Sequence, residues 1–526
     1  MTRIAVIGTG SSGLVTLKYL RDAFPEADLV AFERGHTVRG CWGDPGPDFI
    51  STSTKYTTQF SCFRQWTPEV GSVENFDAFY RGGEFGDYLE AFAEHFDLYR
   101  FIRFGTEVQH LAWQDDHWQL EVVTDGEQHT EHFDAVFLCT GLANRNVPHE
   151  PTHIPVAEDP DTLRNSTVVV VGGGESATGL AHQLAEPERG NTVYLSLRSG
   201  MRVSPRYHPI RGVPSDYLRN RLLLSFSKAT RNAIGEGFVT FRIRFVRLLE
   251  RWFPHREARQ ATSDPVHARR RLWDLKLKAR AKGGLFNVFH NKSDAFLEDV
   301  AEARLHIIGP PTDDTWTRYH DFDRTTTQAI QPDALVWATG YRSRLEELSE
   351  GTIQLKDFYR GCIHSSGRPL YLIGFARPII GNIPAISEMQ ARYAAAVLAG
   401  TCALPSNLEA AQAQAWVDHQ AEYATIDTTQ VYPVEQDPYC DLLARDLGIL
   451  PTRQRGGSWR TWWKLMRLPA STMYYADAYF DADAIQRQHV YTPPVLIGIL
   501  VLLTLVALPR RLFCKLRRPA SHESAL

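Results

Sequence analysis

Two short apolar runs, rich in β-branched residues, each end on a glycine and pass into an apolar pattern of helical period. They are residues 4–7, which are followed by Gly8, and residues 168–171, which are followed by Gly172. A continuous apolar run of this length predicts a buried parallel strand, and the pattern that follows predicts a helix. The chain therefore contains two predicted strand–turn–helix units about 160 residues apart, typical of an α/β fold.

Small residues in both turns have the spacing of a dinucleotide-binding turn. The positions are Gly8, Gly10 and Gly13 in the first turn, and Gly172, Gly174 and Ala177 in the second. Such glycines allow a tight turn and let the backbone approach a pyrophosphate at the helix N-terminus. The alternative, a glycine-rich strand end without a ligand, is weakened by the strand and helix patterns on either side. Two dinucleotides on one chain suit hydride transfer from a nicotinamide to a flavin.

The residue about 20 positions after each turn distinguishes the two nucleotides. Glu33 ends the predicted strand after the first turn, and a carboxylate there bonds ribose hydroxyls and repels a 2′-phosphate. The equivalent strand after the second turn leads to Arg198, whose cation suits a 2′-phosphate, although a plain surface charge is the alternative. We therefore predict FAD at the first turn and NADPH at the second. Neighbours expected in the two sites are Thr9, Ser11, Ser12, Ser196, Leu197 and Ser199.

Two further apolar runs, residues 135–138 and 334–337, are followed by small-residue turns. These turns contain Thr140 and Gly141 in the first case, and Thr339 and Gly340 in the second. Glycine at a strand end lets the backbone pass close to a ligand. One run closes the first predicted unit and the other closes the second, as expected if an NADPH-binding domain were inserted into an FAD-binding domain.

Several segments in this order resemble flavin-containing monooxygenases, the class B flavoproteins that include dimethylaniline monooxygenases. Glu33 is followed by Gly40, Cys41 and Trp42, similar to the family's acidic residue and Gly-Gly-x-Trp. Residues 50–63, with Ser51, Thr52, Ser53 and Lys55, are similar to its Thr/Ser-Asn-x-x-Lys segment, and residues 88–96, 103–108 and 386–392 also match. The resemblance covers roughly residues 3–145, 165–205 and 285–400.

This resemblance implies a reaction in which NADPH reduces FAD and oxygen adds to form a flavin hydroperoxide. A soft nitrogen or sulfur atom of a lipophilic substrate then takes one oxygen atom. Thr52 is the catalytic candidate, as a donor to the flavin edge with Ser51 and Ser53 beside it, and Cys41 and Trp42 are expected at the cofactor. Lys55 either neutralises a phosphate or caps a helix.

Two departures from the family pattern keep other activities open. The family's Asn is replaced by Thr52, and its Phe-x-Gly-x-x-x-His signature is not recognisable in residues 151–160. The alternatives are Baeyer–Villiger oxygenation of a ketone, an uncoupled NADPH oxidase or reductase of the same fold, and, remotely, a non-catalytic membrane scaffold.

The predicted architecture is α/β, with two Rossmann-type three-layer nucleotide-binding domains and a C-terminal hydrophobic helix. FAD is assigned to residues 1–150 and 330–445, and NADPH to residues 151–329 with a basic insertion at about 205–285. A membrane-proximal segment (446–490), a hydrophobic helix (491–510) and a basic tail (511–526) follow.

Composition adds a marked charge asymmetry. The 526 residues suit two or three domains, and their net charge of −4 conceals an excess of 14 positive charges in residues 202–282. Such a stretch favours an anionic surface as partner, and the absence of a recognised motif argues against nucleic acid. The seven cysteines are scattered without metal-ligand spacing, so no metal site is predicted and a reducing compartment is expected.

The C-terminal region predicts membrane attachment. Residues 495–508 are apolar apart from one Gly and one Thr, and with residues 491–494 a helix would reach about 27 Å, slightly short of a bilayer core of about 30 Å. Residues 241–252 and 459–467 show apolar and basic faces, typical of interfacial helices or of helices docked on the core. Because the first strand begins at Arg3 or Ile4, no signal peptide is expected. We predict a C-terminal anchor, spanning or dipping into one leaflet, with the catalytic domains in the cytosol.

Overall fold

The fold was analysed in a computed structural model of the chain. The structure describes residues 2–43, 45–46, 49–66, 78–143, 145–147, 152–207, 213–244, 265–429, 431–450, 452, 458–475, 485 and 487–490, with backbone alone at 145 and 238–244. The predicted hydrophobic helix 491–510 and basic tail 511–526 lie outside these ranges, as do the side chains of the predicted amphipathic segment 241–252. None of the described helices is both long and apolar enough to cross a membrane.

The first sheet is built around the first predicted strand. Its order is β20-β21-β22-β9-β1-β2-β5, and β22, β9, β1, β2 and β5 pair in parallel. The bounds are β1 Arg3–Ile7, β2 Asp28–Phe32, β5 Ile102–Arg103, β9 Ala135–Leu138, β20 Phe358–Tyr359, β21 Ile363–His364 and β22 Leu370–Leu372. Strands from residues 3–138 and 358–372 therefore share one sheet.

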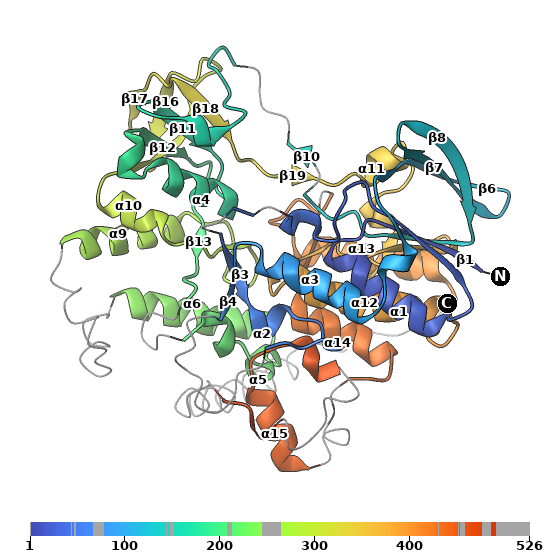
Figure 1. Cartoon of the computed structure of the whole chain (residues 1–526). Helices are drawn as coiled ribbons and strands as arrows, with labels where there is room; N and C mark the ends of the chain where they lie inside the picture. The colour runs from blue at the N-terminus through green and yellow to red at the C-terminus, as the bar shows by residue number, and fades with distance from the viewer. Residues whose placement is uncertain are drawn as a thin grey trace, which may run out of the picture.

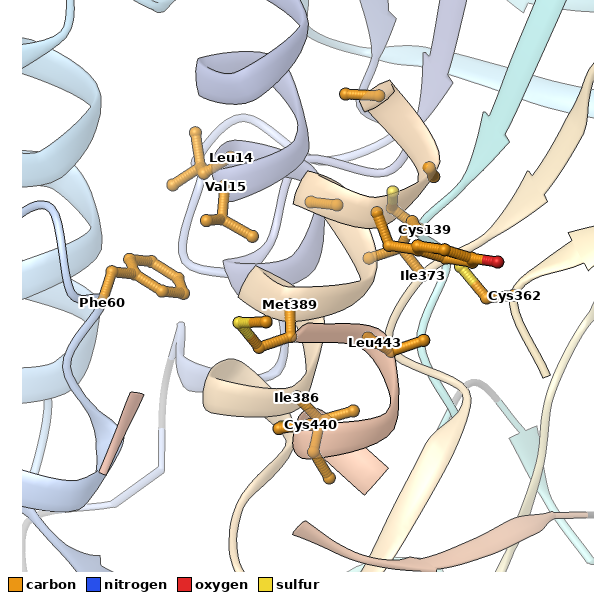
Figure 2. Close-up of a cluster of buried hydrophobic side chains, with 14 of the residues drawn as sticks. Leu14, Val15, Phe60, Cys139, Cys362, Ile373, Ile386, Met389, Cys440 and Leu443 are labelled. Carbon is orange, nitrogen blue, oxygen red and sulfur yellow. The ribbon is translucent and has the colours of Figure 1, made fainter. Parts of the chain in front are cut away.

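Two different layers cover this sheet (Figure 1). Helices α1 (Ser11–Ala23), α3 (Glu84–His95) and α12 (Ile383–Leu398) pack on one face. The antiparallel sheet of β6 (Thr106–Gln114), β7 (His117–Thr124) and β8 (Glu127–Phe133) covers the other. Figure 2 shows part of the helical side, where Leu14 and Met389 from α1 and α12 share a core with Cys139 and Ile373 at the strand ends. This core fixes the position of α1 against the sheet.

The second sheet has the order β17-β16-β15-β12-β11-β18, with β15, β12, β11 and β18 parallel. Its strands are β11 Thr167–Val171, β12 Thr192–Ser196, β15 Leu305–Pro311, β16 Arg318–Asp321, β17 Thr327–Ala329 and β18 Ala334–Trp337. Helices α4 (Glu175–Leu184), α9 (Pro265–Ala279) and α10 (Phe296–Ala301) supply the core on one face. Ile154 and Trp316, from connecting segments, pack on the other face.

Short paired strands link the two sheets. In Figure 1, β10 (Arg145–Asn146) and β19 (Tyr341–Arg342) run antiparallel between the two sheets. The chain therefore passes from the first sheet to the second and back through neighbouring segments. All strands of the second sheet lie between β10 and β19 in the sequence. The prediction of a mixed α/β fold with parallel sheets is confirmed.

The other helices and strands of the described chain lie outside the two large sheets. They are β3 Ile50–Thr54, α2 Lys55–Thr58, β4 Phe79–Arg81, β13 Arg202–Val203, α5 Arg221–Leu224, α6 Lys228–Arg244, β14 His290–Asn291, α11 Leu345–Leu348, β23 Ala376–Ile380, α13 Leu408–Glu422, β24 Tyr432–Glu435, α14 Gln436–Asp446 and α15 Trp459–Arg467. After α15, Leu468 and Tyr474 are buried in the core of the first sheet. The C-terminal part of the described chain thus packs back onto the first sheet.

Candidate active site

Backbone atoms pack tightly against Gly8 and Gly13 of the first glycine turn. Gly8 has a φ of +91°, and a Cβ there would lie 2.8 Å from the carbonyl oxygen of Cys139. A Cβ at Gly13 would lie 1.9 Å from the carbonyl oxygen of Gly8. Helix α1 can therefore start directly above the turn only because these two positions carry no side chain.

Glu33 lies next to this turn, as predicted from its distance along the sequence. Its Oε2 accepts hydrogen bonds from the backbone N–H of Thr9 at 2.9 Å and from the Thr9 hydroxyl at 3.0 Å. Its Oε1 accepts one from the N–H of Gly35 at 2.9 Å. These bonds hold the carboxylate at the end of β2, where it faces a cavity and can accept hydrogen bonds from a ribose.

The second turn is similar but more open at its centre. Gly172 has a φ of +143°, and a Cβ there would lie 2.2 Å from the carbonyl oxygen of Ala338, which follows β18. A Cβ at Gly174, the residue before α4, would meet no atom within 4 Å. The third position is Ala177, which is fully buried. The protein itself therefore requires glycine at 172, whereas glycine at 174 leaves room for a ligand.

Arg198 follows β12 at the edge of the same space. Its side chain is exposed and lines the cavity, while its carbonyl oxygen accepts a 2.7 Å hydrogen bond from Arg324. The neighbouring Ser196 hydroxyl donates to the carbonyl of Gly309 at 3.0 Å, which holds β12 against β15. The Arg198 guanidinium is thus available to an anion at this end of the cavity.

One cavity of about 2400 Å³ joins both turns. Because ordinary small-molecule pockets measure about 300–1000 Å³, this volume suits more than one large ligand. Most of the predicted site residues line it, and Thr9, Gly13 and Ala177 lie behind its wall. The lining members are Gly8, Gly10, Ser11, Ser12, Glu33, Cys41, Trp42, Ser51, Thr52, Ser53, Thr140, Gly141, Gly172, Gly174, Ser196, Leu197, Arg198, Ser199, Thr339 and Gly340.

Thr52, the candidate flavin-edge donor, is held by contacts of its neighbours. The Ser51 hydroxyl donates to the carbonyl of Ser53 at 2.7 Å and accepts from the N–H of Tyr80 at 3.0 Å. The carbonyl oxygen of Thr52 accepts a 2.8 Å hydrogen bond from Nζ of Lys292. Strand β3, which carries Thr52, is therefore connected directly to the segment after β14.

Lys292 is a site residue that sequence reasoning missed. Its Nζ also pairs with Asp216 at 2.7 Å, and its backbone N–H donates to Glu175 Oε1 at 2.9 Å. Burial opposes ionisation of Asp216, but the nearby positive charges outweigh burial and its pKa is lowered. Lys292 therefore links the start of α4, at the second turn, to the Thr52 strand. An isolated lysine shows no spacing pattern from which this role is predicted.

Three other predicted residues have simpler surroundings. Lys55 forms an ion pair with Glu84 at 3.0 Å and is not among the residues that line the cavity, which favours its structural interpretation. Cys41 and Trp42 do line the cavity, and the Trp42 ring contacts Phe85 edge to face at 4.9 Å. Burial raises the pKa of the Cys41 thiol, so this cysteine remains protonated at neutral pH.

The site defines a protein that binds two dinucleotides. It has two glycine turns, with an acidic residue beside one and a basic residue beside the other. Residues 1–294 match the FMO-like family, described as flavin-binding monooxygenase-like. The chain belongs to this family. Two curated relatives are flavin-containing monooxygenase 1 of Mus musculus, 26% identical over 77% of this chain and 75% of the relative, and dimethylaniline monooxygenase [N-oxide-forming] 2 of Rattus norvegicus, 26% identical over 85% and 83%.

Solved structures show the same fold. An S-allyl-L-cysteine S-oxygenase from Allium sativum matches with a TM-score of 0.54 and 18% identity, over 92% of this chain and 98% of that one. A cyclohexanone monooxygenase from Rhodococcus sp. Phi1 bound to NADP+ matches with a TM-score of 0.56 and 16% identity, over 85% and 98%. The protein is a flavin-dependent monooxygenase that uses FAD and NADPH, and the two glycine cradles and the cavity that joins them fit these cofactors.

Proposed function

We propose that the enzyme transfers one oxygen atom from O2 to a soft nitrogen or sulfur atom of a lipophilic substrate, with NADPH as reductant. The observation that carries this proposal is the single cavity in which both glycine turns meet an apolar wall. Bound FAD would supply the two-electron redox chemistry for the oxygen transfer. The relatives named as dimethylaniline monooxygenases support a nucleophilic nitrogen as the acceptor.

The chain's own residues hold and orient the reactants. Glu33 accepts hydrogen bonds from the ribose at the first turn, and Arg198 binds the 2′-phosphate at the second. The Thr52 hydroxyl donates a hydrogen bond to the flavin edge, and Lys292 positions the Thr52 backbone through its 2.8 Å bond. These residues would orient the two bound nucleotides relative to one another, so their contribution would be mainly orientation.

Product analysis tests the proposal. Purified enzyme in detergent is mixed with NADPH and, in turn, a tertiary amine, a thioether and a cyclic ketone, and product, NADPH and hydrogen peroxide are all measured. We expect one molecule of N-oxide or sulfoxide per NADPH consumed. An ester formed from the ketone alone would instead assign Baeyer–Villiger oxygenation. NADPH consumption that yields only hydrogen peroxide with every substrate would refute oxygenation and assign an oxidase.

We infer in addition that the enzyme attaches to an anionic membrane surface with its catalytic domains in the cytosol. Helix α15 supports this attachment, because Trp459 is 58% exposed and lies against Trp462 and Trp463 at ring distances of 5.1 and 6.4 Å. Arg460 lies between Trp459 and Trp462 along the helix, and Lys464 directly follows Trp463. Tryptophans next to cations are typical of helices at the lipid headgroup layer.

Vesicle flotation tests the attachment. The full chain is mixed with vesicles of phosphatidylcholine containing one third phosphatidylserine, and a Trp459→Ser/Trp463→Ser variant is the comparison. We expect binding that decreases with salt and is weaker in the variant. Equal binding to vesicles without phosphatidylserine at all salt concentrations would refute the role of the basic residues, and equal binding of the variant would refute the role of the tryptophans.

A further inference from the structure

Arg377 stands apart from the other cations that line the cavity. Most of these cations are neutralised by a carboxylate. The pairs are Arg202 and Lys278 with Glu236, Arg219 with Asp437, Arg231 with Glu435, Lys292 with Asp216, and Arg344 with Glu107. In the described part of the chain, the side chains of Arg34, Arg198 and Arg377 alone among the cavity-lining cations have no ion pair.

Two of these three arginines belong to the dinucleotide motifs. Arg34 follows Glu33 at the first turn, and Arg198 ends the strand that follows the second. Arg377 belongs to neither motif, because it lies on β23 after the chain has returned to the first sheet. The two dinucleotide motifs therefore do not account for its unpaired charge.

The side chain of Arg377 is open to the cavity but surrounded by protein. Arg377 is exposed and lines the cavity, and its guanidinium lies 4.1 Å from the ring centroid of Phe289. Burial lowers the pKa of Arg377, and the carboxylate of Glu175 offsets this effect only in part. An arginine keeps its proton even so, and a guanidinium that has no ion pair can bind an anion that enters the cavity.

Much of the cavity wall near this charge is apolar. We use the name apolar lobe for the cavity-lining residues Ile234, Leu285, Phe286, Phe289, Ile379 and Val431. The segment carrying Phe286 and Phe289 lies between α6 and β23, since Gly235 is packed against Leu285 and Arg377 against Phe289. Residues 381–384, which follow β23, line the same cavity. The apolar lobe is therefore continuous with the space that contains the two turns.

We propose that the apolar lobe is the substrate subsite and that Arg377 binds an anionic group there, so that the preferred substrates are lipophilic carboxylates bearing the oxidisable atom. This inference rests on the proposed oxygenation and narrows its substrate class. A carboxylate accepts charge-assisted hydrogen bonds from the guanidinium, and the hydrocarbon body of the substrate removes the apolar lobe from water. Arg377 thus selects and orients the substrate without taking part in the redox chemistry.

Equilibrium binding tests the subsite without turnover. Decanoate and decanamide are titrated into the oxidised holoenzyme, and their affinities are measured by calorimetry. We expect the wild-type enzyme to bind decanoate at least tenfold more tightly than decanamide. Arg377→Leu should weaken decanoate about ten- to a hundredfold and leave decanamide nearly unchanged, and Arg377→Lys should retain part of the preference. Equal affinity of the two ligands for the wild-type enzyme would overturn the proposal.

Arg198→Leu is the matched control, because it removes another unpaired arginine from the wall of the same cavity. It should weaken NADP+ and leave decanoate binding intact, and Arg377→Leu should do the reverse. If Arg377→Leu or Arg377→Lys weakens NADP+ and spares decanoate, the anion that Arg377 binds is a cofactor phosphate and the proposal is wrong. If Arg377→Leu loses FAD during purification, Arg377→Lys alone provides the test. We then expect its preference for decanoate over decanamide to be smaller than that of the wild-type enzyme.

Turnover measurements then test the anionic subsite separately from the proposed oxygenation. 6-(Methylthio)hexanoate is compared with its methyl ester, and kcat/KM for sulfoxide formation is measured for wild type and Arg377→Leu. We expect the ratio of acid to ester to fall at least tenfold in the variant. Formation of both sulfoxides without preference would refute the anionic subsite and leave oxygenation standing. No sulfoxide from either compound would refute the proposed oxygenation, while decanoate binding still reports on Arg377.

Discussion

The two glycine turns give a sharp test, because the structure predicts opposite consequences for two similar substitutions. Gly13→Ala places a methyl group 1.9 Å from the carbonyl oxygen of Gly8, although real Cβ atoms are found essentially no closer than 3.0 Å to such atoms. The turn must therefore open by at least about 1 Å. It cannot do so locally, because the other side of Gly8 already faces the carbonyl of Cys139.

Added methylenes in tightly packed sites destabilise proteins by about 1–3 kcal/mol, and more where backbone must move. Since the atoms that oppose Gly13→Ala are backbone atoms of the same turn, we expect about 3 kcal/mol or more. A loss of this size in the β1–α1 unit lowers the ratio of folded to unfolded FAD site more than a hundredfold. The variant should therefore purify without FAD or with a large decrease in the temperature at which FAD is released.

Gly174→Ala is the matched control in the second turn. Its Cβ would meet no protein atom within 4 Å, and the backbone at φ −84° and ψ 177° accepts any residue. The methyl group would occupy space in which a pyrophosphate approaches the start of α4. This variant should retain wild-type FAD content and thermal stability, and bind NADP+ at least tenfold more weakly.

The assay needs only purified protein. FAD content is read from the ratio of flavin to protein absorbance, stability from the release of flavin fluorescence on heating, and NADP+ affinity by calorimetry. Full FAD content with wild-type stability in Gly13→Ala would refute the packing argument at the first turn. Loss of FAD in Gly174→Ala with intact NADP+ binding would show that the two turns have been assigned to the wrong nucleotides.

Three further outcomes follow from single contacts. Arg198→Ala should weaken NADPH at least tenfold and leave NADH nearly unchanged in anaerobic flavin-reduction kinetics; equal losses would refute its 2′-phosphate role. Lys292→Met leaves Asp216 buried without its partner and should lower the free energy of unfolding by about 2 kcal/mol, less than for a fully buried pair because Lys292 is 20% exposed. The double variant with Asp216→Asn should recover most of this loss in chemical denaturation. His182 donates to Asp299, which raises the pKa of the imidazole, so this pair stabilises the fold below about pH 6.5 and its contribution is lost as pH rises through the raised value. His182→Gln should therefore flatten the pH dependence of the melting temperature above about pH 6.5, and an unchanged slope would contradict this.

The parts of the site that were predicted from the sequence are those set by local backbone geometry. Gly8, Gly172 and Glu33 occupy positions fixed by the length of a strand, a turn and a helix, and these lengths can be counted along the chain. The apolar runs at 135–138 and 334–337, which were predicted to close the two units, form strands that pair in parallel with β1 and β11. Local rules of this kind do not depend on which other segment packs nearby.

Residues whose role depends on distant segments could not be predicted. Lys292 acquires its role from Thr52, 240 positions away in the sequence, and from Asp216. Arg377 is singled out only because no carboxylate of the described residues forms an ion pair with it, whereas most of the other cavity cations have such a pair. Such roles come from the pairing of charges in the folded chain, and composition gives no information on that pairing.

The basic insertion shows why charge counts along a chain mislead. An excess of positive charge in residues 202–282 favoured an anionic partner, but in the described residues many of these cations pair with carboxylates from outside the stretch. The pairs include Arg219 with Asp437, Arg221 with Asp441, Lys228 with Glu422, Arg231 with Glu435, Arg270 with Asp294, and Lys276 with Asp323. Asp437, Glu422 and their neighbours contribute to the negative excess of the rest of the chain, so part of the asymmetry is complementary within one molecule. Attachment to an anionic membrane is therefore supported less by the insertion than by α15, where cations lie beside the exposed Trp459.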